Sequence, residues 1–322
     1  MSTDTLVEHE VEQQDPKQLW SGGKPPFKAS YGKLMMWYFL LSDAFTFAGF
    51  LISYGALRMS MPSWPVPDFV FSLFPFTGDT SLPLVFVTFM TFVLLFSSFT
   101  MVRAVQEGHR ENKKGVAIWM IFTIIGGLGF LGCQAWEWTT LIAKEHMSLT
   151  IDPFGTHTEA GVYLNADGSD SDDVFEAGSS YLIHAIGGHH GEDHGAEGQA
   201  ENHEEDSHGS DHTAAGDYPD AVVDDKGFIH RKYKVTEGAN AGMIKEEAFG
   251  PKAFGALFFF ITGFHGFHVF SGVVFLIIIL INVLSGLYVK RKNGYEMVEK
   301  IGLYWHFVDL VWVFVFLVFY LL

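Results

Sequence analysis

The sequence predicts an all-α integral membrane protein. Its expected fold is a five-helix transmembrane bundle with an outward acidic, His-rich insertion between helices 3 and 4. Of the 322 residues, 48% are hydrophobic and 32 are Phe, which is high for a soluble domain. Five segments are apolar over about 20 residues, the length that a helix needs to cross a bilayer. The acidic residues gather in one stretch between two of these segments.

The predicted spans divide the chain into four parts. Residues 1–32 form a tail, 33–142 hold helices 1 to 3, 143–251 form the insertion, and 252–322 hold helices 4 and 5. The individual spans are residues 33–57, 84–105, 116–142, 254–284 and 301–322. The tail is acidic before any apolar run, whereas a cleavable signal peptide begins with positive charge, so we expect none here. The single cysteine, Cys133, lies in an apolar run and is expected to be a packed core thiol.

The distribution of Lys and Arg near the span ends predicts the orientation of the helices. Twelve of these residues flank the side that carries the N-terminus, and four flank the other side. Because cytoplasmic loops carry the excess of positive charge, the N-terminus is predicted to be cytoplasmic. The insertion and the C-terminus then face outward.

The insertion holds the acidity of the whole chain. Residues 150–250 contain 22 Asp and Glu against 5 Lys and Arg, a net charge of −17 that equals the charge of the full chain. A basic footprint for nucleic acid is therefore lacking. Turn sequences at 165–168 and 224–227 lie beside short apolar runs and predict β-hairpins. Residues 187–216 are mostly Gly, His, Glu and Asp, a composition with little to bury.

Ionisable residues inside the predicted spans are candidates for function, because charge at mid-membrane costs about 2.5–3.5 kcal/mol on insertion scales. Asp43 lies about 15 Å into the first span, and His268 about 21 Å into the fourth span, which runs the opposite way. In a core about 30 Å thick these depths bring the two within reach of each other. Further candidates are His306 and Asp309 in the last span, and Gln134 and Glu137 near the outer end of the third.

Each candidate also has a purely structural interpretation, which the sequence leaves open. Glu137 is close to the interface with water, and His306 with Asp309 can form a packed hydrogen-bonded pair that joins helices. Asp43 is harder to explain in this way, because the spans hold no Lys or Arg at its depth. Since desolvation favours the neutral carboxyl, we expect Asp43 to be protonated at neutral pH and to react with hydrophobic carbodiimides.

The histidines do not predict a haem or copper site within the membrane. Only three lie in the spans, and no second cluster of His or Met accompanies them. In the insertion, two pairs are spaced i, i+4 and would hold Zn²⁺ or Cu²⁺ weakly if locally helical: His190 with His194, and His208 with His212. A solvated acidic spacer is the simpler interpretation of that segment.

Sequence motifs in all five spans resemble one family, subunit III of the haem–copper respiratory oxidases, in its bacterial five-helix form. The motifs in chain order are WYFLLSDAFTFAGF from Trp37, SSFTM from Ser97, GFLGCQAWEW from Gly129, FITGFHGFHVFSG from Phe260 and WHFVDLVW from Trp305. The first is similar to the family's helix with the carbodiimide-reactive carboxylate, which places Asp43 in that role. Mitochondrial members carry Glu there, so this chain is closer to bacterial forms. The insertion matches no known part of the family.

The resemblance implies a non-redox subunit of a cytochrome c oxidase complex. It implies packing against subunit I, contact with subunit II and other respiratory subunits, a lipid-filled cleft with structural phospholipid, and haem and copper only in partner subunits. It further implies support of proton uptake and of sustained turnover in aerobic respiration. The cytoplasmic residues Glu107, His109 and Glu111 are candidates for a proton antenna, with an ordinary solvated turn as the alternative.

Three rival functions remain. The homologous subunit associated with nitric oxide reductase would share the five spans. A divalent-metal transporter would combine a His-rich loop with intramembrane Asp and His, although five spans leave no room for an inverted repeat. A membrane scaffold would differ from subunit III mainly in leaving oxidase turnover unchanged. The choice between cytochrome c and quinol as electron donor is not encoded in this chain.

Overall fold

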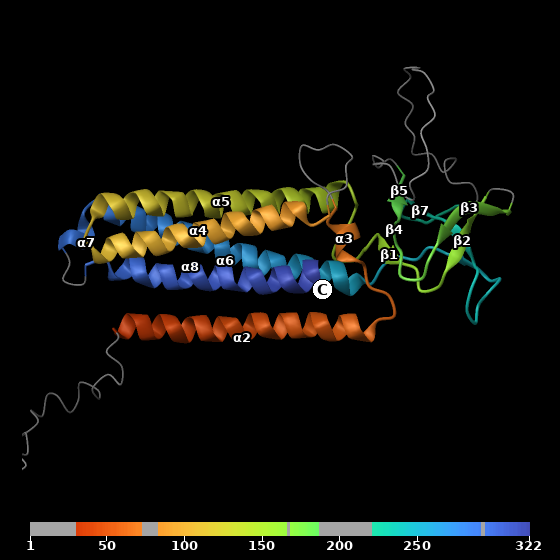
Figure 1. Cartoon of the computed structure of the whole chain (residues 1–322), viewed down its shortest axis with the longest axis horizontal. Coiled ribbons are helices and arrows are strands. Elements are labelled where there is room, and N and C mark those ends of the chain that lie inside the picture. The colour runs from red at the N-terminus through yellow and green to blue at the C-terminus, as the bar shows by residue number, and fades with distance from the viewer. Residues whose placement is uncertain (1–29, 73–82, 166–167, 187–220, 291–293) are drawn as a thin grey trace, which may run out of the picture.

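The computed structural model describes residues 30–72, 83–165, 168–186, 221–290 and 294–322. Long helices lie side by side, and a group of short strands lies beyond one end of them (Figure 1). Five helices are long and apolar enough to cross a membrane, which confirms the prediction of five spans. They are α2 (Tyr31–Ser60), α4 (Val85–His109), α5 (Lys113–Ala143), α6 (Lys252–Leu284) and α8 (Glu296–Phe316), the last continued by the π-helix η1 (Leu317–Leu321).

Local capping explains where two of the spans begin. The side chain of Ser30 accepts a hydrogen bond from the backbone N–H of Lys33 at the start of α2, and that of Asn112 accepts one from Gly115 at the start of α5. Two short helices connect the spans: α3 (Pro67–Val70) follows α2, and α7 (Leu287–Lys290) follows α6. Figure 1 places α7 at the end of the bundle opposite to the strands.

The centre of the bundle is packed around two tryptophans of α8. Trp305 donates its indole N–H to Ser97 Oγ at 3.0 Å, and Trp312 donates to Thr91 Oγ1 at 3.0 Å, so both reach α4. Ser97 in turn donates to the backbone carbonyl of Thr123 in α5 at 3.1 Å. These bonds satisfy polar groups that would otherwise be buried without partners, and they lock α4, α5 and α8 together.

Gly127 of α5 has no side chain and so leaves the space that the ring of Trp305 fills. This close approach predicts the effect of Gly127→Ala. A Cβ at Gly127 would lie 2.6 Å from Trp305 Cη2 and 2.8 Å from Val273 Cγ2. We expect this substitution to lower the stability of the chain by about 1–3 kcal/mol through overpacking. The matched control is Gly132→Ala on the same helix, where an added Cβ meets nothing within 4 Å. Thermal unfolding in detergent checks both, and equal midpoints for the two variants would contradict the prediction.

Helix α2 is the least enclosed of the five spans. Its most apolar 18-residue window is only 11% buried, against 39–50% for the other four helices. Its buried residues are Leu40, Phe47 and Tyr54, one side of the helix. Figure 1 shows α2 as a separate rod along the bundle. Large apolar side chains such as Phe45 and Ile52, each 71% exposed, therefore face lipid or another protein.

The described part of the insertion is a β structure, so the all-α prediction is wrong for this part of the chain. Its nine described strands are β1 (Phe154–Thr156), β2 (Gly161–Leu164), β3 (Asp170–Phe175), β4 (Ser180–Leu182), β5 (His184–Ala185), β6 (Val222–Val223), β7 (Phe228–His230), β8 (Lys232–Val235) and β9 (Ile244–Glu246). They form three antiparallel sheets, ordered β1-β4, β3-β2-β8-β9 and β5-β7-β6. The predicted hairpins are confirmed as the pairs β2–β3 and β6–β7.

The four-stranded sheet is held by a buried polar and aromatic cluster. His157, 3% exposed, stacks on Phe175 with ring centroids 3.6 Å apart, and its Nε2 lies 3.0 Å from Tyr163 Oη. Tyr163 donates to Glu247 Oε1 at 2.7 Å, and Arg231 Nε donates to the same oxygen at 3.2 Å. Residues far apart in the sequence are thus joined by one hydrogen-bonded network, which indicates a folded domain, although Nδ1 of His157 has no partner among the described residues.

Acid is predicted to destabilise this domain through His157. Burial, aided by the nearby Arg231 charge, lowers the pKa of His157 to about 4. The unfolded imidazole takes up its proton near pH 6.5. Stability from this residue is therefore complete above pH 6.5 and is lost as pH falls toward 4, by about 3 kcal/mol in total. His157→Phe is expected to remove this loss, measured as proteolysis of the domain in the full chain at each pH.

The control for this experiment is His146→Gln, which alters an exposed histidine. Burial raises the pKa of Asp152 to about 8 and also raises that of Glu247. These two carboxyls therefore stabilise the domain as the pH falls, which opposes the effect of His157. The informative quantity is therefore the difference between each variant and the parent chain. The same dependence on pH in His157→Phe and in the parent would contradict the assignment.

Candidate functional site

Asp43 of α2 and His268 of α6 meet inside the bundle. Nε2 of His268 lies 3.0 Å from Oδ2 of Asp43, and the side chains are 10% and 11% exposed. The approach does not satisfy the angle of a linear N–H···O bond, so the contact is an electrostatic pair. The sequence depths of the two residues predicted this proximity.

The surroundings of His268 fix the ring and its tautomer. Nδ1 lies 2.8 Å from the backbone carbonyl of Phe264 and must donate its proton there. Nε2, which carries no proton in this neutral tautomer, then faces the carboxyl of Asp43. A single proton shared by Nε2 and the carboxyl leaves the pair without net charge, the state that costs least to hold in an apolar interior.

Neighbouring groups hold the pair in place from α2, α6 and α8. The ring of Phe47, one turn along α2 from Asp43, lies 5.5 Å from the imidazole, and that of Phe264 lies 4.7 Å from it. The backbone carbonyl of His268 accepts hydrogen bonds from Tyr304 Oη at 3.1 Å and from Ser271 Oγ at 2.9 Å. The pair is therefore both a candidate proton site and a tie between the exposed helix α2 and the bundle.

His306 and Asp309 meet through a third residue rather than as a simple pair. Ser98 of α4 lies 2.6 Å from His306 Nδ1 and also hydrogen-bonds to Asp309. Asp309 Oδ1 has no hydrogen-bond partner among the described residues. Ser98 lies in the SSFTM motif, but nothing in the sequence indicated that it contacts His306 or Asp309. The three side chains join α4 to α8 in the inner half of the bundle.

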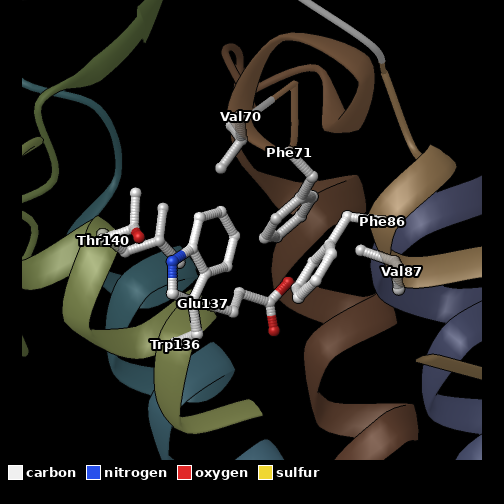
Figure 2. Close-up of a pocket in the computed structure, with 8 residues that line it drawn as sticks. Val70, Phe71, Phe86, Val87, Trp136, Glu137 and Thr140 are labelled. Carbon is white, nitrogen blue, oxygen red and sulfur yellow. The ribbon is translucent and has the colours of Figure 1, made fainter. Parts of the chain in front are cut away.

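Glu137 lies in an apolar pocket near the C-terminal end of α5. Both carboxylate oxygens accept from Tyr320 Oη, at 3.1 and 3.2 Å. Figure 2 shows the carboxylate pointing between the rings of Phe71 and Phe86, with Trp136 beside it. The full lining of the pocket is Val70, Phe71, Phe86, Val87, Trp136, Glu137, Thr140 and Leu141. Glu137 is thus a buried group with one phenol partner and not an interfacial carboxylate in water.

The predicted antenna residues differ from one another in exposure. Glu107 is only 7% exposed and accepts from Asn112 Nδ2 at 2.7 Å and from Arg110 Nη1 at 3.2 Å. It closes the turn between α4 and α5 and does not face water. His109 and Glu111 are exposed and line a polar hollow together with Tyr295, Glu296 and Glu299.

The metal candidates of the insertion, His190, His194, His208 and His212, lie outside the described residues. Among the residues that the structure describes, no three His, Cys, Asp or Glu side chains gather in a way that would hold a metal ion.

Comparisons with known proteins agree with the motif pattern. Residues 234–322, which include α6 and α8, match the family model described as cytochrome c oxidase subunit III. The chain is therefore similar to the subunit III family of the haem–copper oxidases over this segment. With five apolar helices among the described residues, the chain is a multi-pass membrane protein.

Relatives of this chain carry two kinds of oxidase name. A quinol oxidase subunit 3 of Bacillus subtilis is 31% identical over 141 residues, 40% of this chain and 63% of the relative. A probable cytochrome c oxidase subunit 3 of Rickettsia prowazekii is 35% identical over 95 residues, 30% of this chain and 29% of the relative. A cytochrome c oxidase subunit 3 of Marchantia polymorpha is 46% identical over 68 residues, 21% and 24% of the two chains. The chain therefore matches less than two thirds of the length of these relatives.

Proposed function

We propose that the chain is the non-redox subunit III of a proton-pumping terminal oxidase, packed against subunit I and adjacent to subunit II. The observation that carries this proposal is the family match over α6 and α8, the helices that supply His268, His306 and Asp309. The haem and copper of such an enzyme belong to partner subunits. The relatives' names include both a quinol and a cytochrome c oxidase, and the electron donor is left to the other subunits.

The Asp43–His268 pair supports a role in keeping the oxidase active through its place in the bundle. It joins α2, whose outer side is free for lipid or a neighbouring subunit, to α6 in the core. A pair without net charge, at a depth where the spans hold no Lys or Arg, is stable in the membrane. We infer that it orders α2 and the phospholipid beside it, and so the contact with subunit I.

Supply of protons from the cytoplasm is assigned to His109 and Glu111. Both are exposed at the turn between α4 and α5, and the hollow beside them carries two further carboxylates, Glu296 and Glu299. Grouped carboxylates and imidazole raise the local supply of protons near a membrane surface. Glu107 has no part in this role, because its carboxylate is buried and bonded within the turn.

The orientation follows from charge, with the N-terminus cytoplasmic and the insertion periplasmic in a bacterial inner membrane. The insertion and the described end of the chain lie at the same end of the bundle (Figure 1), as this orientation requires. Protease added to intact spheroplasts is expected to cut within the insertion. Cleavage only in inside-out vesicles would contradict the orientation.

Purification of the tagged chain in mild detergent tests membership of the complex. Mass spectrometry is expected to identify an oxidase subunit I in stoichiometric amount. Recovery of a nitric oxide reductase instead would favour the related reductase-associated subunit. Metal uptake into vesicles by the chain alone would favour a divalent-metal transporter, for which the described residues offer no ligand cluster.

A further inference from the structure

Two polar side chains in the seam between α5 and α6 are fully enclosed by apolar neighbours. His265 is 0% exposed, and its ring lies among those of Phe130 at 5.8 Å, Trp312 at 5.3 Å and Phe47 at 6.3 Å. Gln134 is 6% exposed. Neither ring nitrogen of His265 and neither amide atom of Gln134 has a hydrogen-bond partner among the described residues.

The amide of Gln134 lies beside the turn of α6 that carries His265. A Cβ at Gly266, the residue after His265, would lie 3.9 Å from Gln134 Oε1, so the amide reaches the α6 backbone at that turn. Phe130, one turn before Gln134 on α5, is also the residue whose ring touches the imidazole edge-on. Both groups lie roughly 14–20 Å from the outer ends of their helices, at 1.5 Å per residue.

The two ring nitrogens of His265 and the two amide atoms of Gln134 need hydrogen-bond partners. A buried polar group without a hydrogen-bond partner destabilises the fold, and lipid hydrocarbon offers no such partner. The missing partner must both donate and accept, since the amide and a neutral imidazole each do both. Apolar lipid and metal ions do not have this chemistry, whereas water does, and buried waters typically make about three such bonds.

We propose that Gln134 and His265 form a binding site for ordered water that bridges α5 and α6 inside the membrane. The water accepts from the amide or imidazole N–H and donates to the amide oxygen or the second ring nitrogen. The site is separate from the Asp43–His268 pair, although the rings of His265 and His268 both contact the ring of Phe47. It gives the bundle a second exchangeable position and holds the imidazole in a neutral form.

Radiolytic footprinting of the intact complex in nanodiscs tests the site, because hydroxyl radicals formed from bound water oxidise the side chains that touch it. Phe130 and Trp312 are expected to be oxidised several-fold more than Phe258, which is equally buried at 0% exposure. In the double variant Gln134→Leu with His265→Phe, oxidation should fall to the level of Phe258. Equal oxidation of all three aromatics in the parent complex would overturn the proposal.

A double-mutant cycle provides a second measurement. Gln134→Leu and His265→Phe each leave the other polar group with an incomplete set of bonds, and each is expected to lower the unfolding midpoint by roughly 3–6 °C. The double variant removes both partners and should recover most of the loss. Fully additive losses would show that the groups share no water and would also overturn the proposal.

Discussion

An oxidase complex stripped of this chain is expected to begin oxygen consumption at a substantial rate at low pH and then to lose activity over successive turnovers. The reason is that the proposed function gives this chain a part in proton delivery and in the stability of the catalytic subunit, and not in electron transfer. Because the proton concentration falls tenfold per pH unit, the steady rate of the stripped complex should drop severalfold between pH 6 and 8. The intact complex should show a shallower decline. Oxygen uptake against time at several pH values measures both effects.

Restoration of the purified chain provides the control for the stripped complex. Added wild-type chain should restore sustained turnover. A chain that carries both His109→Ala and Glu111→Ala should prevent the decay of activity but should not restore the steady rate of oxygen uptake at high pH. Identical initial rates and identical decay with and without the chain would leave only a scaffold. That result would remove the role in turnover while leaving the family assignment intact.

Hydrophobic carbodiimides are expected to label the chain at Asp43, and Asp43→Asn should abolish the labelling. In this reaction the carboxylic O–H adds across a C=N bond of the reagent: the proton passes to nitrogen and the carboxylate oxygen bonds to carbon. The reaction therefore needs a protonated carboxyl in an apolar site. Mass spectrometry of the labelled chain identifies the modified residue.

Two further variants sharpen the carbodiimide experiment. Glu137→Gln removes the other carboxylate that lies deep in an apolar pocket, and it should leave labelling unchanged because Tyr320 already donates to both oxygens of Glu137. His268→Phe removes the group that competes for the proton, and labelling of Asp43 should become faster. Labelling that persists in Asp43→Asn would identify another carboxyl as the target.

The sequence predicted the features that depend on the length of the apolar segments and on the depth of a residue in the membrane. Apolar runs of the right length became the five helices, and counting residues from opposite ends brought Asp43 to His268, 3.0 Å apart. Both predictions work because a membrane helix has a fixed rise per residue and a fixed thickness to cross.

Features that depend on neighbours from other segments escaped prediction. Ser98 and Tyr320 acquire their roles only because α4 and η1 bring them to His306 and Glu137. Glu107 appeared exposed in a charged loop, yet the turn folds its carboxylate back onto Asn112. The sheets of the insertion pair residues as distant as Val162 and Lys234, and no local pattern encodes such a pairing.

Optical absorption of the purified complex and of the dissociated chain tests the central claim most directly. We expect the complex that co-purifies with the tagged chain to show the bands of haem. The chain separated from its partners should show none, with less than one haem or copper per ten chains. A haem band stoichiometric with the isolated chain would contradict the assignment of a non-redox subunit III.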